Sequence, residues 1–271
     1  MKENPKYVRK SDSQFPSSLL KTAAKIRSDA SFNLTKECVS SMVAYTQQLT
    51  AGLGLSLSWL TSAYGQPPPT NITPTTGVGD LGTTVTQVDN VRDITGGIRP
   101  GGGPNLFHSF ENFSIGAGDV ANFLNDSSLA TDNILSRVTG GTQSDIFGTL
   151  RTTGFPGAQL FLLNPAGIWF GPNARLNVEG AFHASTANYL RFEDGTRFSA
   201  SPNPAGDVLS VAPVASFGFL EPDPGKLSIK GSQLSVPKGE MLTVVSGDMD
   251  IGEGASLTAP EGRVNLVSVG S

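Results

Sequence analysis

Three acidic side chains near the C-terminal end are spaced in a way that could support chemistry. Asp248, Asp250 and Glu253 lie within six residues, and carboxylates grouped in this manner can bind Ca²⁺ or act as an acid and base pair in polysaccharide cleavage. Asp248 and Asp250 also alternate with Met249 and Ile251, a pattern typical of the solvent side of a strand. The sequence leaves both interpretations open and favours the solvated strand.

The two histidines, His108 and His183, could each act as a general base or a metal ligand. Neither has a second titratable residue at a recognisable spacing, and they lie far apart in the sequence. His108 stands among phenylalanines, and His183 alternates with apolar residues. We therefore expect half-buried polar residues at both positions, and we predict no catalytic residue, no metal site and no cofactor.

The charge distribution divides the chain into a basic leader and an acidic body. Residues 1–65 carry eight Lys and Arg against four Asp and Glu, whereas residues 66–271 carry eleven against nineteen. Binding to phosphates requires clustered Lys and Arg, so the acidic body argues against a nucleic acid partner. Cys38 is the only cysteine, which excludes an internal disulfide and a Cys-ligated metal site.

Residues 1–65 are predicted to contain an extended signal peptide. The apolar run Leu49–Leu60 is too short to span a bilayer but fits the apolar region of a signal peptide. Because Ala63 and Gly65 are both small, we expect cleavage between Gly65 and Gln66. The alternative is a buried core segment near the N-terminus.

Residues 66–77, QPPPTNITPTTG, are rich in Pro and Thr and lack apolar periodicity. This composition predicts an extended linker. Ordered structure is therefore expected to begin near Val78, which gives a domain at 78–271.

Short apolar runs separated by turn residues dominate this domain. Each run is too short for a helix but long enough for a strand, which indicates an all-β fold. Asn164-Pro165 and Gly171-Pro172-Asn173 stand where the chain must turn, because Pro fixes φ and Asn and Gly tolerate positive φ. The runs in the central stretch are Leu160–Leu163, Ile168–Phe170, Leu176–Val178 and Ala181–His183.

An internal repeat narrows the architecture. Gly231–Val245 aligns with Gly254–Ser268 at an offset of 23 residues, and periods of this size are typical of solenoids. Several short strands per repeat favour a parallel β-helix, with a two-sheet sandwich as the alternative. Because no polar or helical segment follows the last repeat, we expect the domain to lack a C-terminal cap. The identical pairs are Gly231/Gly254, Leu234/Leu257, Pro237/Pro260, Gly239/Gly262 and Val244/Val267.

Three segments, in order and with sensible spacing, resemble the N-terminal secretion domain of filamentous haemagglutinin-like proteins. These are the two-partner secretion exoproteins of Gram-negative bacteria and cyanobacteria. The resemblance implies a right-handed parallel β-helix with N-terminal capping strands, and a signal peptide for export by the Sec machinery. It also implies a non-enzymatic, secreted, adhesin-like protein at the cell surface, with a polysaccharide-active β-helix enzyme as the alternative. The segments are Asn105–Phe110, Asn133–Gly141 and Leu163–Ile168.

The resemblance further implies a partner, an outer-membrane β-barrel transporter whose POTRA domains recognise two Asn-containing motifs. The second motif corresponds to Asn164, Pro165, Gly167 and Ile168, with Ala166 in place of the middle Asn. The first corresponds loosely to the segment from Asn125 to Leu129, which lacks the Pro. A turn without any partner is the alternative role for Asn164-Pro165, and the sequence indicates no particular surface ligand.

Overall fold

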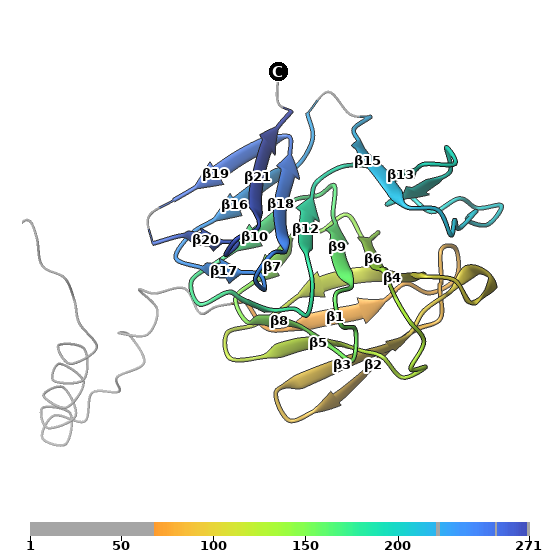
Figure 1. Cartoon of the computed structure of the whole chain (residues 1–271), viewed down its shortest axis with the longest axis horizontal. Coiled ribbons are helices and arrows are strands. Elements are labelled where there is room, and N and C mark those ends of the chain that lie inside the picture. Colours follow the sequence, from red (N-terminus) through yellow and green to blue (C-terminus); the bar gives the residue numbers. More distant parts are fainter. Residues whose placement is uncertain (1–67, 221–222, 253, 270–271) are drawn as a thin grey trace, which may run out of the picture. The chain divides into compact units, whose positions relative to one another are not determined.

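The computed structural model describes residues 68–220, 223–252 and 254–269. In this part the chain forms a parallel β-solenoid of about seven turns (Figure 1), with a short 3₁₀ turn η3 (Pro100–Gly102) near its beginning. None of the helices in these ranges is long and apolar enough to cross a membrane. The predicted all-β solenoid is confirmed.

Sheet A is one of two seven-stranded walls of the solenoid, in the order β1-β4-β6-β9-β12-β18-β21. Its strands from β4 onward pair in parallel, whereas β1 lies antiparallel to β4. The antiparallel strand closes the N-terminal end of this wall. The strands are β1 (Asn71–Pro74), β4 (Asn105–Ser114), β6 (Asn133–Val138), β9 (Gln159–Leu163), β12 (Phe182–Ser185), β18 (Met241–Ser246) and β21 (Arg263–Ser268).

Sheets B and C form the other two walls. Sheet B has the order β2-β3-β5-β8-β11-β17-β20 and begins with the antiparallel pair β2–β3, while sheet C is the parallel array β19-β16-β10-β7. The expected N-terminal capping strands are thus β1 and β2. The strands are β2 (Thr83–Val88), β3 (Val91–Gly96), β5 (Val120–Leu124), β7 (Ser144–Ile146), β8 (Thr149–Thr153), β10 (Ile168–Phe170), β11 (Arg175–Asn177), β16 (Lys226–Ile229), β17 (Gln233–Ser235), β19 (Asp248–Ile251) and β20 (Ser256–Thr258).

Strand β1 corrects the expected linker at residues 66–77, because ordered structure begins before Val78. Ile72 pairs with Phe113 and packs against the core. The Thr70 hydroxyl donates to the Asp119 carboxylate at 2.5 Å and accepts from a backbone amide. Pro74 is compatible with β1 because this strand lies at the edge of its sheet. A single apolar residue in a Pro-rich segment was too weak a signal for a strand.

The solenoid interior is filled by alternate residues of the strands. In β4, Leu106 and Phe110 point inward, while Asn105 and Phe107 point to the outer face of sheet A, as the period of two requires. Near the N-terminal end the inner core is aromatic, and the Phe110 and Phe113 ring centroids lie 5.0 Å apart. Edge-to-face pairs of this kind add to the stabilisation from area burial.

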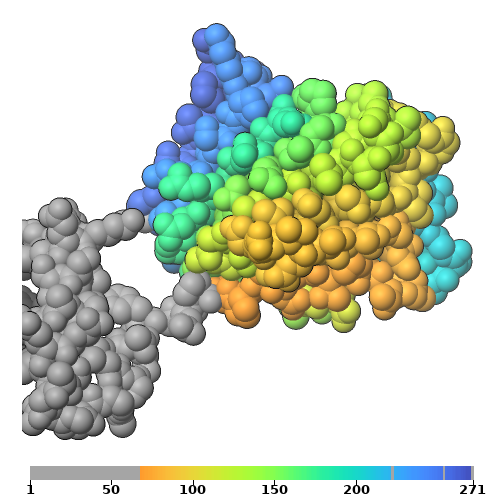
Figure 2. All heavy atoms as spheres, turned by 90° about the horizontal axis from the view of Figure 1, so that it is seen from below, coloured from red at the N-terminus to blue at the C-terminus, as the bar shows by residue number. Residues whose placement is uncertain are grey.

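Between β12 and β16 the chain leaves the solenoid and forms an antiparallel sheet D, in the order β14-β13-β15. This insert covers the outer face of sheet A, where Phe107 and Phe198 lie 5.0 Å apart in a second buried apolar cluster. Figure 2 shows the cyan atoms of the insert next to the orange and yellow atoms of the first strands. The insert therefore interrupts the coils of the β-helix between β12 and β16. The strands are β13 (Tyr189–Phe192), β14 (Arg197–Ser199) and β15 (Val214–Gly218).

The C-terminal repeat stacks as predicted in its first half only. Leu234 pairs with Leu257, which matches the offset of 23 residues. Farther on, Val244 pairs with Leu266 rather than with Val267, an offset of 22. The later coil has one residue fewer in the corner before β21, and this places Leu266 rather than Val267 in line with the inward-facing Val244.

Candidate functional site

The segment Asn164–Gly167 forms the corner between β9 and β10. Asn164 is buried, Pro165 is half-buried and Ala166 is exposed. The Asn164 side-chain oxygen accepts from the Ala166 amide at 3.0 Å, and the Asn164 carbonyl accepts from the Gly167 amide at 3.1 Å. Gly167 has a φ of 117°, which favours glycine. The predicted turn is confirmed.

Asn164 also joins this corner to its neighbours in the stack. Its side-chain amide donates to the Thr142 carbonyl and to the Ser144 hydroxyl, both at 2.9 Å, in the preceding coil. Its backbone amide donates to the Ser185 carbonyl at 2.9 Å in the following coil. Every polar group of Asn164 is therefore hydrogen-bonded inside the fold, and none is free for a partner in the folded state.

The looser motif lies in an exposed loop between β5 and β6. The Asn125 side-chain amide donates to the Leu129 carbonyl at 3.0 Å and to the Gly154 carbonyl at 2.9 Å. The Leu129 side chain is 45% exposed. The structure thus separates the two motifs, with Asn164 and Ile168 inside the solenoid and Leu129 at its surface.

The proposed acidic cluster is a solvent-facing strand with lysine partners. Asp250 forms ion pairs with Lys230 at 2.8 Å and Lys226 at 3.3 Å, and Asp248 lies 3.8 Å from Lys226. Hydrogen bonding to Lys230, and then to Lys226, lowers the pKa of Asp250. Glu253 lies outside the described residues. Residues 68–220, 223–252 and 254–269 contain no group of three His, Cys, Asp or Glu that could hold a metal ion.

Both histidines pack against aromatic rings and are more buried than expected. The His108 ring lies in the inner core 5.4 Å from the Phe123 ring, and burial, followed by the charge of Arg99, lowers its pKa to about 3. His183 stacks on Phe161 at 4.3 Å on the outer face of sheet A, and burial lowers its pKa to about 4. Neutral rings enclosed in this way are suited to packing.

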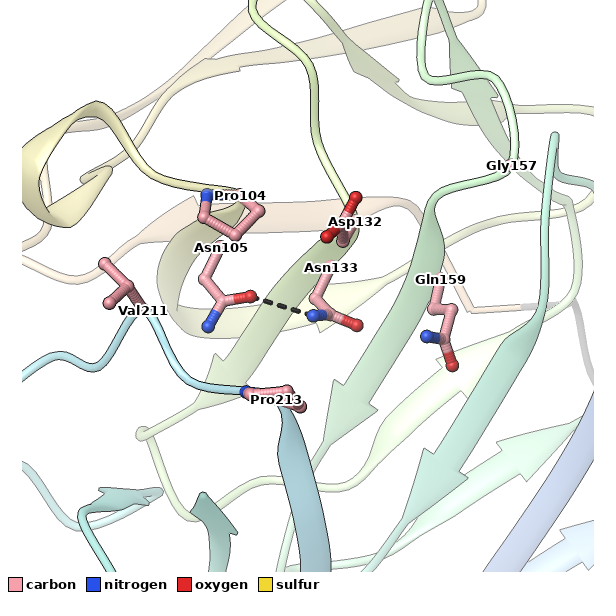
Figure 3. A pocket seen from close by; sticks show the side chains of 8 residues that line it. All are labelled: Pro104, Asn105, Asp132, Asn133, Gly157, Gln159, Val211 and Pro213. Atoms are coloured by element: carbon pink, nitrogen blue, oxygen red, sulfur yellow. Dashed lines mark hydrogen bonds between the residues drawn. The ribbon is translucent and has the colours of Figure 1, made fainter. Parts of the chain in front are cut away.

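A hollow of about 290 Å³ lies where the insert meets sheet A (Figure 3). Asn105, Asn133 and Gln159 stand in one register on β4, β6 and β9 and line it. Asn133 donates to the Asn105 side-chain oxygen at 2.8 Å, and Asn105 donates to the carbonyls of Ser210 and Ala212 at 2.9 and 2.8 Å. The Asn105 side chain thus joins the insert to the solenoid, and Asn133 holds that side chain in place. The sequence did contain a signal for this role, because Asn105 and Asn133 each stand at the start of one of two neighbouring strands.

Sequence reasoning also missed the role of Arg137. A single arginine beside a turn is usually solvated, yet the Arg137 side chain is fully buried between sheet A and the insert. One signal was present, because Arg137 occupies an outward position in the apolar strand β6 and is followed by the turn Thr139–Gly141. Its partners lie far away in the sequence, so their identity could not be read from spacing.

The antiparallel cap, the parallel walls and the external insert define a capped β-solenoid. Residues 70–271 match a family model described as TPS secretion domain. The chain therefore belongs to the TPS, or two-partner secretion, secretion-domain family, and it is the secretion domain of an exoprotein of this system. This is not an enzyme family.

The crystal structure of the HMW1 secretion domain from Haemophilus influenzae is similar, with a TM-score of 0.47 and 16% sequence identity. The similarity covers 73% of this chain and 45% of that chain. No curated protein gave a significant match to the sequence. The family match begins at residue 70, in agreement with strand β1 and ahead of the expected domain start at Val78.

Proposed function

We propose that the POTRA domains of an outer-membrane β-barrel transporter recognise this secretion domain in the periplasm and pass it to the cell surface. Export across the inner membrane would use the Sec machinery and a signal peptide cleaved between Gly65 and Gln66, residues that lie outside the described part of the chain. At the surface the exoprotein acts as an adhesin. Membership of the two-partner secretion family supports the transporter.

The burial of Asn164 supports recognition of the chain before it folds. Because Asn164 is 1% exposed and all its polar groups are bonded within the fold, a transporter can read Asn164, Pro165, Gly167 and Ile168 only before the solenoid forms. An unfolded segment can bind a sheet edge by strand addition, which uses backbone hydrogen bonds and side-chain pockets. The recognised form is therefore the extended chain.

A secretion assay tests this route. The full chain is expressed in a Gram-negative host with and without its transporter, and the medium and cell surface are probed with an antibody. We expect external protein only when the transporter is present, with an N-terminus at Gln66. Equal amounts outside the cell without the transporter would refute the proposal.

The exposed Leu129 provides a second test, since its loop remains accessible in every state of the chain. We expect Leu129→Ser to change the free energy of unfolding by no more than about 0.5 kcal/mol, as for most surface substitutions, and to lower secretion severalfold. Val88→Ser is the matched control, because Val88 is 58% exposed at the end of β2. Unfolding by urea and immunoblots of the medium measure the two effects. Equal secretion of both variants would remove Leu129 from the recognition surface.

A further inference from the structure

Arg137 is the largest fully buried side chain in the described part of the chain. Its guanidinium donates to the Ser109 hydroxyl at 2.9 Å on β4 and to the Ser199 carbonyl at 2.7 Å on β14. It also donates to the Gly79 carbonyl at 3.1 Å and to the Asp207 carboxylate at 2.5 Å. The Arg137 guanidinium is thus hydrogen-bonded to the segment before β2, to the solenoid wall at β4 and to two parts of the insert.

Asp207 is the only carboxylate that forms an ion pair with Arg137 among the described residues, and it follows Arg137 by 70 positions. The remaining partners are neutral. The Phe198 ring lies 4.8 Å from the guanidinium carbon, and it also arrives with the insert. A buried arginine without a carboxylate is strongly unfavourable. The outer face of β4 and β6 therefore cannot close over Arg137 until residue 207 is in place.

The side-chain amide of Asn105 on β4 holds the loop of residues 200–212 at a second point. Asn105 donates to the carbonyls of Ser210 and Ala212, and the Ser210 hydroxyl donates to the Asp194 carboxylate at 2.5 Å. The loop of residues 200–212 is thus bonded at Asp207 to β6 and at Ser210 to β4. Packing of the Phe107 and Leu135 side chains under the insert completes the closure.

We propose that the loop of residues 200–212 is a folding latch. The first coils stay open until Asp207 meets Arg137, and they then become stable together with sheet D in a single step. The inference rests on the proposed function, because the open chain is the form that the transporter recognises. The latch delays folding of the motif-bearing coils until Asp207, which follows Arg137 by 70 positions, is available.

Refolding of the full chain followed by pulsed hydrogen exchange tests the latch without any transporter. In the wild type, the amides of β4 and β6 are expected to become protected at the same rate as those of β13 and β14. Asp207→Asn keeps the side-chain shape but removes the charge, and we expect it to slow both at least tenfold. Glu193→Gln, an exposed carboxylate on the same insert, is the control and should refold at the wild-type rate.

A double variant keeps the test decisive if Asp207→Asn does not fold. Combining Arg137→Met with Asp207→Asn removes both charges, so β4 and β6 should become protected before sheet D. Protection of β4 and β6 ahead of sheet D in the wild type would overturn the latch, as would simultaneous protection in the double variant. Loss of secretion without a change in this order would instead concern the transporter proposal alone.

Discussion

Asn164→Ala is expected to lower the free energy of unfolding by about 3 kcal/mol. The substitution removes the side-chain bonds to Thr142, Ser144 and Ala166, and it leaves the buried Ser144 hydroxyl without this partner. A buried polar group that loses its partner costs about 1–3 kcal/mol, and the corner loses several bonds at once. Urea unfolding monitored by circular dichroism measures the loss.

Ala166→Asn is the matched control for this corner. Position 166 is exposed, so the added amide should change the free energy of unfolding by no more than about 0.5 kcal/mol. It also restores the middle Asn of the family motif.

If Asn164 serves recognition as well as the turn, Asn164→Ala lowers secretion even in medium that stabilises the fold. A folded Asn164→Ala protein that is secreted normally would leave only the turn.

Acid is expected to destabilise the domain through its two buried histidines. Burial holds the pKa of His108 at about 3 and that of His183 at about 4, below the value of 6.5 for a free histidine. The unfolded chain therefore binds protons more readily than the folded chain in this range. The contribution to stability is complete above pH 6.5, and each histidine removes about 1.4 kcal/mol per pH unit as the pH falls toward its folded pKa.

His108→Leu isolates this effect. Thr83 keeps the hydrogen bond from the Ser109 amide when the imidazole is removed, so little polar bonding is lost. Urea unfolding at pH 7 and at pH 5 should show a smaller loss of stability for the variant, by about 1.4 kcal/mol for each pH unit below 6.5. An identical pH dependence of the wild type and the variant would contradict this account. It would mean that the pKa of His108 is the same in the folded and the unfolded chain.

Local pattern was sufficient to predict the repeating part of the fold. Residues 160–163 and 168–170 lie in β9 and β10, and the corner between them follows from Asn, Pro and Gly. The same reasoning gave a one-residue error at Val267, because the length of a solenoid corner can change between coils without a change in composition. Strand patterns fix which residues alternate but leave the register to the corners.

Long-range contacts set the limit of prediction. The insert between β12 and β16 has strands and turns like those of the solenoid, so nothing local distinguishes an antiparallel sheet outside the coil from further coils. Arg137 and Asp207 gain their meaning only when the insert folds back onto β6. In the candidate site, the turn at Asn164 was predictable, whereas its burial depends on Thr142, Ser144 and Ser185 in neighbouring coils.

The most direct test of the central claim is binding of the transporter's POTRA domains to the chain before and after folding. The mature chain is diluted from denaturant over immobilised POTRA domains, either at once or after folding is complete. We predict binding of the freshly diluted chain and its loss at the rate of folding, because the solenoid buries Asn164. Equal or tighter binding of the fully folded chain would contradict recognition of the extended form.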